Sequence, residues 1–240
     1  MSLTSDIIKA TNPTEDLQRA IHLLFKDNMS LARCDTGSII EAIKYCQLMG
    51  WLPGKMFKQA YFIPYGNKVQ LIPGYKGLIK LAYENGYEII SETVHANDVF
   101  VAPYFDPEHG KIVDHQQAME RGEMIGAYAV ALMRNGKWNA NYLNLNDIWQ
   151  KAQKGKSKGS KVRKPEGITL DDIRKLGGAY ADFPEEMARV RAVAALMRDL
   201  DISPHLMEAV DLVDKQPERE VKQVKYQTEE DAISSMNGGV

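Results

Sequence analysis

Residues 60–82 read AYFIPYGNKVQLIPGYKGLIKLA, and this stretch decides the fold of the chain. Two segments rich in β-branched and aromatic residues, 60–65 and 68–72, flank the pair Gly66-Asn67, which predicts a β-hairpin with a two-residue turn. Apolar residues at helical spacing follow Gly74, so a helix is expected to begin there. A hairpin that leads directly into a helix is typical of an α+β protein.

The segment before this stretch has the pattern of helices. An apolar stripe at helical spacing follows Thr14, which predicts a first helix capped by that residue. Ser38-x-x-Glu41 has the form of a capping box and predicts a second helix that begins there and runs to Gly50. We therefore expect residues 1–58 to form a helical N-terminal region, whose apolar stripe suits contact with a neighbouring subunit.

The segment after it has the pattern of strands. Residues 89–95 are rich in β-branched side chains, and a long hairpin is expected over 124–142 with a type I′ turn at Asn135-Gly136. Helices return at Pro184 and over 204–213, because proline favours the first turn. The expected fold class is α+β, an antiparallel β-meander with hairpins packed against helices, with a core over residues 59–213.

Composition limits the class of protein. The chain has 240 residues, 44% of them hydrophobic, which suffices for one globular core plus a tail. Cys34 and Cys46 form no Cys-x-x-Cys pair, which argues against a disulfide framework and a structural zinc site. There is no apolar leader and no run near the roughly 18 residues that cross a bilayer. We expect a cytoplasmic protein without membrane contact, ending in a disordered, slightly acidic tail over 214–240.

The strongest signal for a ligand is a basic segment at residues 151–164. The formal net charge is −2, so binding of a polyanion requires a local concentration of Lys and Arg. This segment has seven cations, no acid, and interspersed Gly and Ser, so a mobile loop that contacts phosphates is expected. Its cations are Lys151, Lys154, Lys156, Lys158, Lys161, Arg163 and Lys164. The alternative is a merely solvated linker.

Signals for nucleotide or metal chemistry are weak. The closest approach to a Walker A loop begins at Gly50, but it is one residue short and has Met56 where a hydroxyl is needed. The histidines show no metal-binding spacing, and His109 and His115 are expected to be exposed beside a turn. Asp98 and Asp114, with two more acids near the turn, leave a metal-dependent nuclease as a minor alternative. No cofactor is expected, and a contribution from magnesium stays open.

Aromatic and arginine side chains offer further candidates. Strand aromatics could stack on bases, although core packing is the better prediction for most of them: Tyr61, Tyr65, Tyr128, Trp138 and Tyr142. Arg191 and Arg198 are seven residues apart on the late helix and therefore lie on one side of it. They are expected either to hold phosphates or to rim the core.

A resemblance adds to this interpretation. The stretch 60–82 resembles the core of the RecT family, the single-strand annealing proteins of phages and prophages. Further similar segments are ANDVF at 96–100, GAYAVA at 126–131 and EMAR at 186–189. The likeness extends over roughly residues 15–213. The chain departs from the family after Arg189, where Val190-Arg191 replaces a usual Lys-Thr pair, and Phe183 is the nearest aromatic to a usual tryptophan.

The resemblance implies a function and a set of contacts. It implies an oligomer, a ring or helical filament, that binds single-stranded DNA and anneals a second strand to form a duplex without ATP. Candidate DNA contacts carried over from it are Lys68, Gln70, Tyr75, Lys76 and Lys80, with Arg189 on the late helix. The alternative for Tyr75 is an anchor in the core. It also suggests a phage exonuclease and a host single-strand-binding protein as partners. The sequence is equally compatible with a non-annealing DNA-binding protein, and a scaffold without nucleic acid is a further interpretation.

Overall fold

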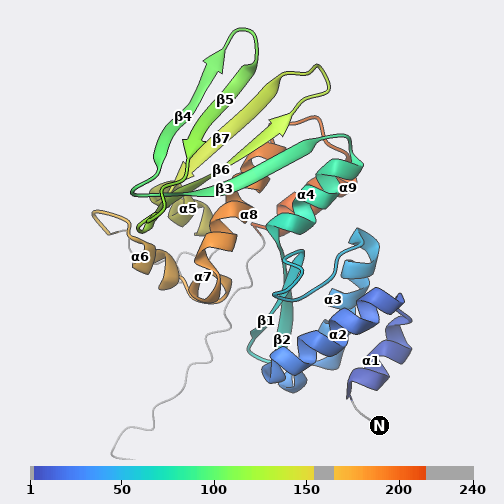
Figure 1. The fold of residues 1–240 in the computed structure, drawn as a ribbon. Helices are drawn as coiled ribbons and strands as arrows, with labels where there is room; N and C mark the ends of the chain where they lie inside the picture. The colour runs from blue at the N-terminus through green and yellow to red at the C-terminus, as the bar shows by residue number, and fades with distance from the viewer. Residues whose placement is uncertain (1–2, 154–164, 215–240) are drawn as a thin grey trace, which may run out of the picture.

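The computed structural model describes residues 3–153 and 165–214 (Figure 1). Most of the basic segment, residues 154–164, and the tail from residue 215 onward lie outside the described residues, and so do the predictions made for them. The described residues have α+β architecture, with helices packed on a β-sheet and a smaller helical region beside a β-hairpin. The expected fold class is therefore confirmed.

The main sheet has five strands in the order β3-β6-β7-β5-β4. Their bounds are β3 Glu88–His95, β4 Val99–Asp106, β5 Gly110–Gln116, β6 Met124–Leu132 and β7 Trp138–Asn144. The hairpins β4–β5 and β6–β7 are antiparallel, but β5 meets β7 in a parallel pairing of Gly110 with Trp138. The order thus departs from a simple meander. A Cβ at Gly110 would lie 2.5 Å from the Trp138 carbonyl oxygen, so glycine permits this close approach.

The β6–β7 hairpin was predicted correctly, but its turn type was not. A type I′ turn needs positive φ at two consecutive residues, and of Asn135 and Gly136 only the glycine has one, at 76°. The Gly136 amide donates to the Met133 carbonyl, and the Met133 amide donates to the Lys137 carbonyl. The connection is therefore a longer turn that closes with glycine in the left-handed region.

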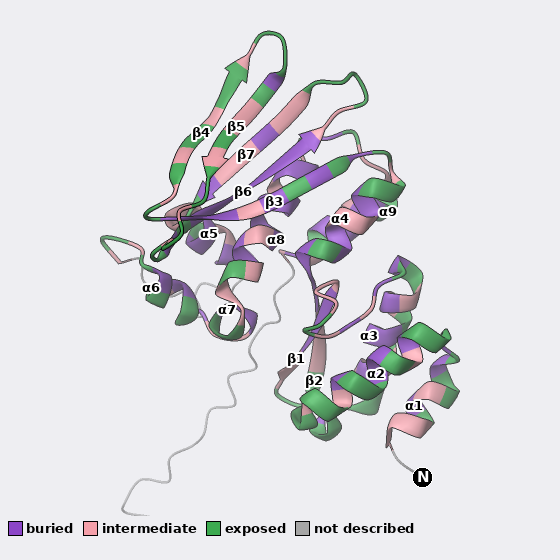
Figure 2. Cartoon of the chain, viewed as in Figure 1, coloured by how far each residue is buried: buried purple, intermediate pink, exposed green. Residues whose placement is uncertain are grey.

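Helix α8, Pro184–Met197, lies against one face of this sheet (Figures 1 and 2). Ala127, Ala129 and Ala131 of β6 are buried on that face, and their small side chains let the helix approach the strand closely. Pro184 occupies the first helical turn, as predicted. The helices that border α8 include α4 Tyr75–Glu84, α5 Leu145–Ala152 and α9 Pro204–Leu212.

The predicted hairpin and helix of residues 60–82 are confirmed. Strands β1, Ala60–Tyr65, and β2, Lys68–Pro73, pair in register around Gly66-Asn67, and α4 follows directly. Glycines 74 and 77 allow α4 to pack against the chain entering β1: a Cβ at Gly74 would lie 2.1 Å from the Lys58 carbonyl oxygen, and one at Gly77 2.2 Å from that of Gln59. The Trp51 indole also donates to the Gly77 carbonyl at 3.0 Å.

The N-terminal region is helical as expected, with one boundary corrected. It contains α1 Leu3–Thr11, α2 Glu15–Asp27, the 3-10 helix η1 Met29–Arg33 and α3 Thr36–Met49. Helix α3 begins before Ser38 because Asp35 is its N-cap and accepts a hydrogen bond from the Ser38 amide. The Ser38 hydroxyl instead accepts from the Val69 amide of β2. Two short helices, α6 Leu170–Arg174 and α7 Ala179–Asp182, precede α8.

Among the described residues, none of the helices has the length and apolar character that crossing a bilayer requires.

Candidate nucleic-acid interface

Arg189 joins three segments that are distant in sequence. It projects from the first half of α8, and its guanidinium carbon lies 3.9 Å from the centre of the Tyr75 ring at the start of α4. The same guanidinium donates to the Ser91 carbonyl of β3 and lies 3.4 Å from the Glu92 carboxylate. A cation on an aromatic face with a carboxylate beside it is held in one orientation. Tyr75 itself is buried and anchors α4.

A lysine that the sequence did not single out lies next to this group. The Lys58 ammonium contacts the Glu186 carboxylate of α8 at 2.7 Å. The backbone carbonyl of Lys58 accepts a hydrogen bond from the Lys76 amide. Lys58 has a φ of 55°, an uncommon value for a residue with a side chain, which marks a tightly constrained approach to β1. The side-chain hydrogen bond with Glu186 raises the pKa of Lys58, so this cation stays charged at neutral pH.

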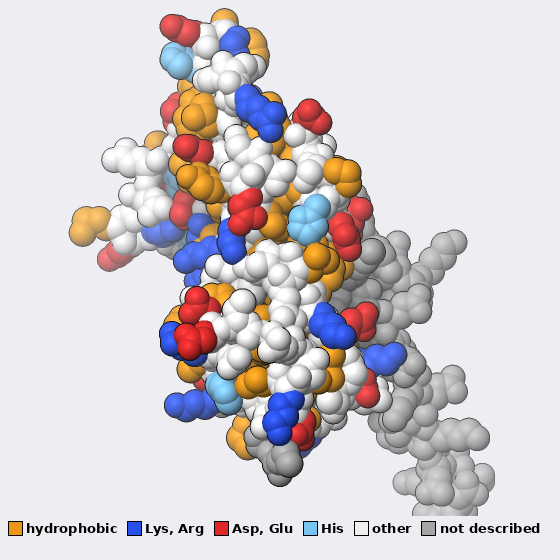
Figure 3. Space-filling model, turned by 90° about the vertical axis from the view of Figure 1, so that its right-hand side faces the viewer, with side chains coloured by type: hydrophobic (Ala, Val, Ile, Leu, Met, Phe, Trp, Pro, Cys, Tyr) orange, Lys and Arg blue, Asp and Glu red, His pale blue; other side chains and the backbone are white. Residues whose placement is uncertain are grey.

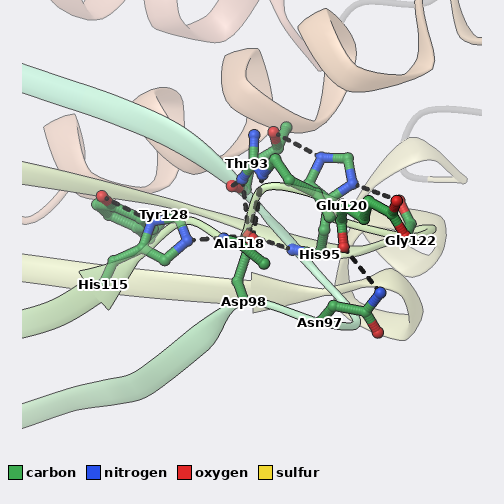
Figure 4. A network of polar contacts seen from close by, with 10 residues as sticks. Thr93, His95, Asn97, Asp98, His115, Ala118, Glu120, Gly122 and Tyr128 are labelled. Atoms are coloured by element: carbon green, nitrogen blue, oxygen red, sulfur yellow. Dashed lines mark hydrogen bonds and ion pairs between the residues drawn. The ribbon is translucent and has the colours of Figure 1, made fainter.

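Asp98, in the turn between β3 and β4, organises a second polar network (Figure 4). Its carboxylate exposes 0% of its surface and accepts from the Arg121 guanidinium at 2.7 Å. It also accepts from the amides of His95 and Ala118 and from the His115 ring. The hydrogen bonds from Arg121 are the largest cause that holds the pKa of Asp98 well below its usual range. The carboxylate is therefore charged although it is buried.

The histidine of this network corrects a prediction. His115 was expected to be exposed, but only 4% of its side chain is accessible. Its Nε2 lies 3.0 Å from Asp98, its Nδ1 lies 3.3 Å from the Tyr128 hydroxyl, and Phe100 packs edge-on against the ring. The sequence placed His115 beside a turn, whereas β5 continues through it and turns its ring toward the apolar cluster of β6 and β7.

The network also bears on the nuclease alternative. Asp98 is fully engaged by hydrogen-bond donors, and Asp114 accepts from the Tyr104 hydroxyl. Within residues 3–153 and 165–214, no group of three acidic, histidine or cysteine side chains is placed to hold a metal ion. A nuclease site built on these acids therefore has no support in the described part of the chain.

The candidates carried over by resemblance, other than Arg189 of α8, lie on the hairpin and on α4. Lys68 is exposed at the first position of β2, and Gln70 is half-buried in the middle of that strand, opposite Ile63. Lys76 is exposed one residue after Tyr75. Lys80, one turn further along α4, donates to the Gly50 carbonyl at the end of α3. Of these residues, Tyr75 contacts Arg189 through its ring, and Lys76 contacts Lys58 through a backbone hydrogen bond.

The arginines further along α8 have structural contacts. Arg191 is 2% exposed and donates to the Tyr180 hydroxyl and to the Asp214 carboxylate. Arg198 contacts the other oxygen of Asp214 at 2.9 Å. Together they tie α8 to the chain that leaves α9. Arg191 has almost no surface to offer a phosphate, so of its two expected roles the structure favours the one in the core.

The basic segment is only partly within the described residues. Lys151 lies in the last turn of α5, where a cation complements the helix dipole, rather than in a loop. The other six cations lie outside the described residues: Lys154, Lys156, Lys158, Lys161, Arg163 and Lys164.

Most of the strand aromatics are packed inside the protein, as predicted. Tyr61 stacks on Phe183 with a centroid distance of 5.3 Å, and the Lys55 ammonium lies 5.2 Å from the Phe183 ring. These residues line a cavity of about 510 Å³ between β1, α2 and α7. Tyr128 stacks on Phe100, and Tyr142 packs against that ring too, within the small apolar cluster on the second face of the sheet.

Charges of both signs alternate over the face in Figure 3, without a broad patch of either sign. This agrees with the net charge of −2. Sequence reasoning missed Lys58 and Arg121, because single cations in loops have no periodic pattern. The one available signal for Arg121 was Asp98 in the ANDVF segment, since a carboxylate between apolar strands needs a partner.

The amino-acid sequence is similar to known proteins over most of its length. The sequence profile of the RecT family matches residues 15–203. The protein RecT of Escherichia coli (strain K12) is 28% identical over 200 residues, which cover 78% of this chain and 66% of that protein. The aligned region thus spans just under two thirds of the relative. The matched range contains Tyr75, Asp98, Arg121 and Arg189.

Proposed function

Because this chain belongs to the RecT family, we propose that it binds single-stranded DNA and anneals complementary strands, without ATP, in homologous recombination. The observation that carries the proposal is the position of Arg189 on the Tyr75 ring, with the Lys58 ammonium nearby and the exposed Lys76 one residue after Tyr75. Three requirements of phosphate binding meet there: fixed cations, partial exposure and a rigid support from α8 and α4.

The proposed mechanism divides the work between protein and DNA. Cations hold the phosphates of one strand and leave the base edges accessible, so that Watson–Crick pairing selects the second strand. Duplex formation is itself favourable, which removes the need for nucleotide hydrolysis. We include Lys68, Gln70 and Lys80 as contacts at the border of this surface, and the cations of residues 151–164 as a further, salt-sensitive contribution.

The remaining parts of the proposal concern assembly and location. We propose a homo-oligomer, a ring or a filament, with contacts through the helical region of residues 1–58. The proposed site of action is the cytosol of a bacterial host, with a phage exonuclease and the host single-strand-binding protein as partners. Residues 214–240 are the proposed docking segment, since they are rich in charge and poor in large apolar groups.

Annealing of two complementary fluorescent oligonucleotides, at low salt and without nucleotide, tests the function. We expect the protein to accelerate pairing of the complementary strands and to leave a non-complementary pair unpaired. Binding of a single strand without acceleration would favour a protein that only protects single-stranded DNA. Absence of both binding and acceleration would contradict the proposal.

Neutralising the basic segment tests its contribution separately. Replacing Lys154, Lys156, Lys158 and Lys161 by glutamine is expected to weaken binding of a single-stranded oligonucleotide. The slope of log K against log salt concentration should flatten by about 0.7 for each phosphate that the variant no longer neutralises. The matched control replaces four exposed lysines elsewhere in the chain: Lys26, Lys44, Lys111 and Lys137. Equal slopes for the two variants would remove the segment from the DNA-binding surface.

A further inference from the structure

The outer edge of β3 is closed by two arginines. Strand β3 is the first strand of the sheet, and its partner β6 lies on one side only. On the other side, Arg189 donates to the Ser91 carbonyl and Arg121 donates to the Thr93 carbonyl at 2.6 Å. A strand edge with unpaired carbonyls invites pairing with another chain, and bound guanidinium groups prevent it. Protection of the β3 edge explains why two arginines lie there, but it does not explain why both side chains are partly exposed.

Each of these arginines is oriented by a carboxylate and keeps part of its surface open. Asp98 binds Arg121 through both the Nε and Nη2 atoms, and Glu92 lies beside the Nη2 of Arg189. Their side chains expose 25% and 21% of their surface. In the part of the chain that the structure describes, Nη1 of neither guanidinium makes a hydrogen bond. Both groups therefore retain a donor for a ligand.

The spacing of the two arginines follows from the strand. Ser91 and Thr93 are two residues apart, so their carbonyl oxygens are separated by roughly 6.6 Å along β3. Consecutive phosphates of an extended nucleic-acid strand have a comparable separation. Each guanidinium group is held on one of these carbonyl oxygens, so the two can bind successive phosphates with little loss of conformational entropy.

From this geometry we propose that Arg121, positioned by Asp98, is a phosphate-binding residue that acts beside Arg189 on the next phosphate of the same DNA strand. The inference rests on the proposed function. It adds Arg121 to the DNA-binding residues and gives the path of the bound DNA strand, which runs along the outer edge of β3. Asp98 is a positioning residue in this arrangement. It fixes the Arg121 guanidinium and does not itself contact DNA.

The test measures single-strand affinity as a function of salt for variants at Arg121. Arg121→Gln is expected to flatten the slope of log K against log salt concentration by about 0.7. If the variant and the wild type bind equally at 1 M salt, this slope means that the variant binds about fivefold more weakly at 0.1 M salt. Arg121→Lys should recover most of the slope, because it retains the charge. Arg134→Gln, which removes an exposed cation at the β6–β7 turn, is the matched control and should leave the slope unchanged.

A second variant keeps the test independent of folding. Arg121→Gln leaves the buried Asp98 carboxylate without its main partner, whereas Asp98→Asn combined with Arg121→Gln replaces both charges. Circular dichroism establishes that the double variant is folded, and its slope should be as shallow as that of the single variant. A wild-type slope in this folded double variant would overturn the role of Arg121 while leaving the proposed function intact. Absence of DNA binding by the wild-type protein would overturn both.

Discussion

Replacing Gly77 by alanine is expected to destabilise the protein by about 3 kcal/mol or more. The added methyl group would lie 2.2 Å from the Gln59 carbonyl oxygen and 2.9 Å from the Trp51 indole nitrogen. Both are fixed, the first by the backbone and the second by its hydrogen bond to the Gly77 carbonyl. Alanine favours a helix over glycine by about 1 kcal/mol, but the forced displacement of α4 from β1 outweighs that gain.

Urea denaturation followed by circular dichroism measures this effect. Gly167→Ala is the matched control, because the position has open space for a Cβ and no positive φ. We expect the control to unfold at the wild-type midpoint or slightly above it, since alanine restricts the unfolded chain. A Gly77→Ala variant as stable as the control would show that α4 can move away from the hairpin at little cost.

Replacing Asp98 by alanine is expected to lower the free energy of unfolding by about 3–5 kcal/mol, the range for breaking a buried ion pair on one side. The amides of His95 and Ala118 lose their acceptor, and the buried ring of His115 loses its partner. Arg121 is partly exposed and can turn toward water, which places the effect near the lower end of this range.

The comparison for Asp98 is another acid of the same sheet. Asp114 of β5 is hydrogen-bonded to Tyr104 at an exposed position, so Asp114→Ala should change stability by less than about 1 kcal/mol. Denaturant midpoints of the two variants, measured at pH 7, give the contrast. Equal midpoints would mean that the Asp98 network in Figure 4 contributes no more to the stability of the fold than the exposed contact of Asp114.

Part of the interface could be predicted from the sequence and part could not. Tyr75 and Arg189 came from the resemblance, and the structure brings them together. Lys58 and Arg121 were missed, because their partners Glu186 and Asp98 are distant from them in the sequence and neither pair belongs to a periodic pattern. Arg191 had two expected roles, and its burial and its contacts with Tyr180 and Asp214 favour the one inside the protein.

The sequence by itself determined the local elements. The turn at Gly66-Asn67, the helical spacing after Gly74 and the proline at the start of α8 are short-range signals, because each depends on the φ and ψ preferences of adjacent residues. Only the tertiary structure decided which strands are neighbours and which charges meet. β5 adjoins β7 and Arg121 meets Asp98 because distant segments of the chain pack together. The free energy of that packing depends on residues far apart in the sequence, so no local pattern predicts it.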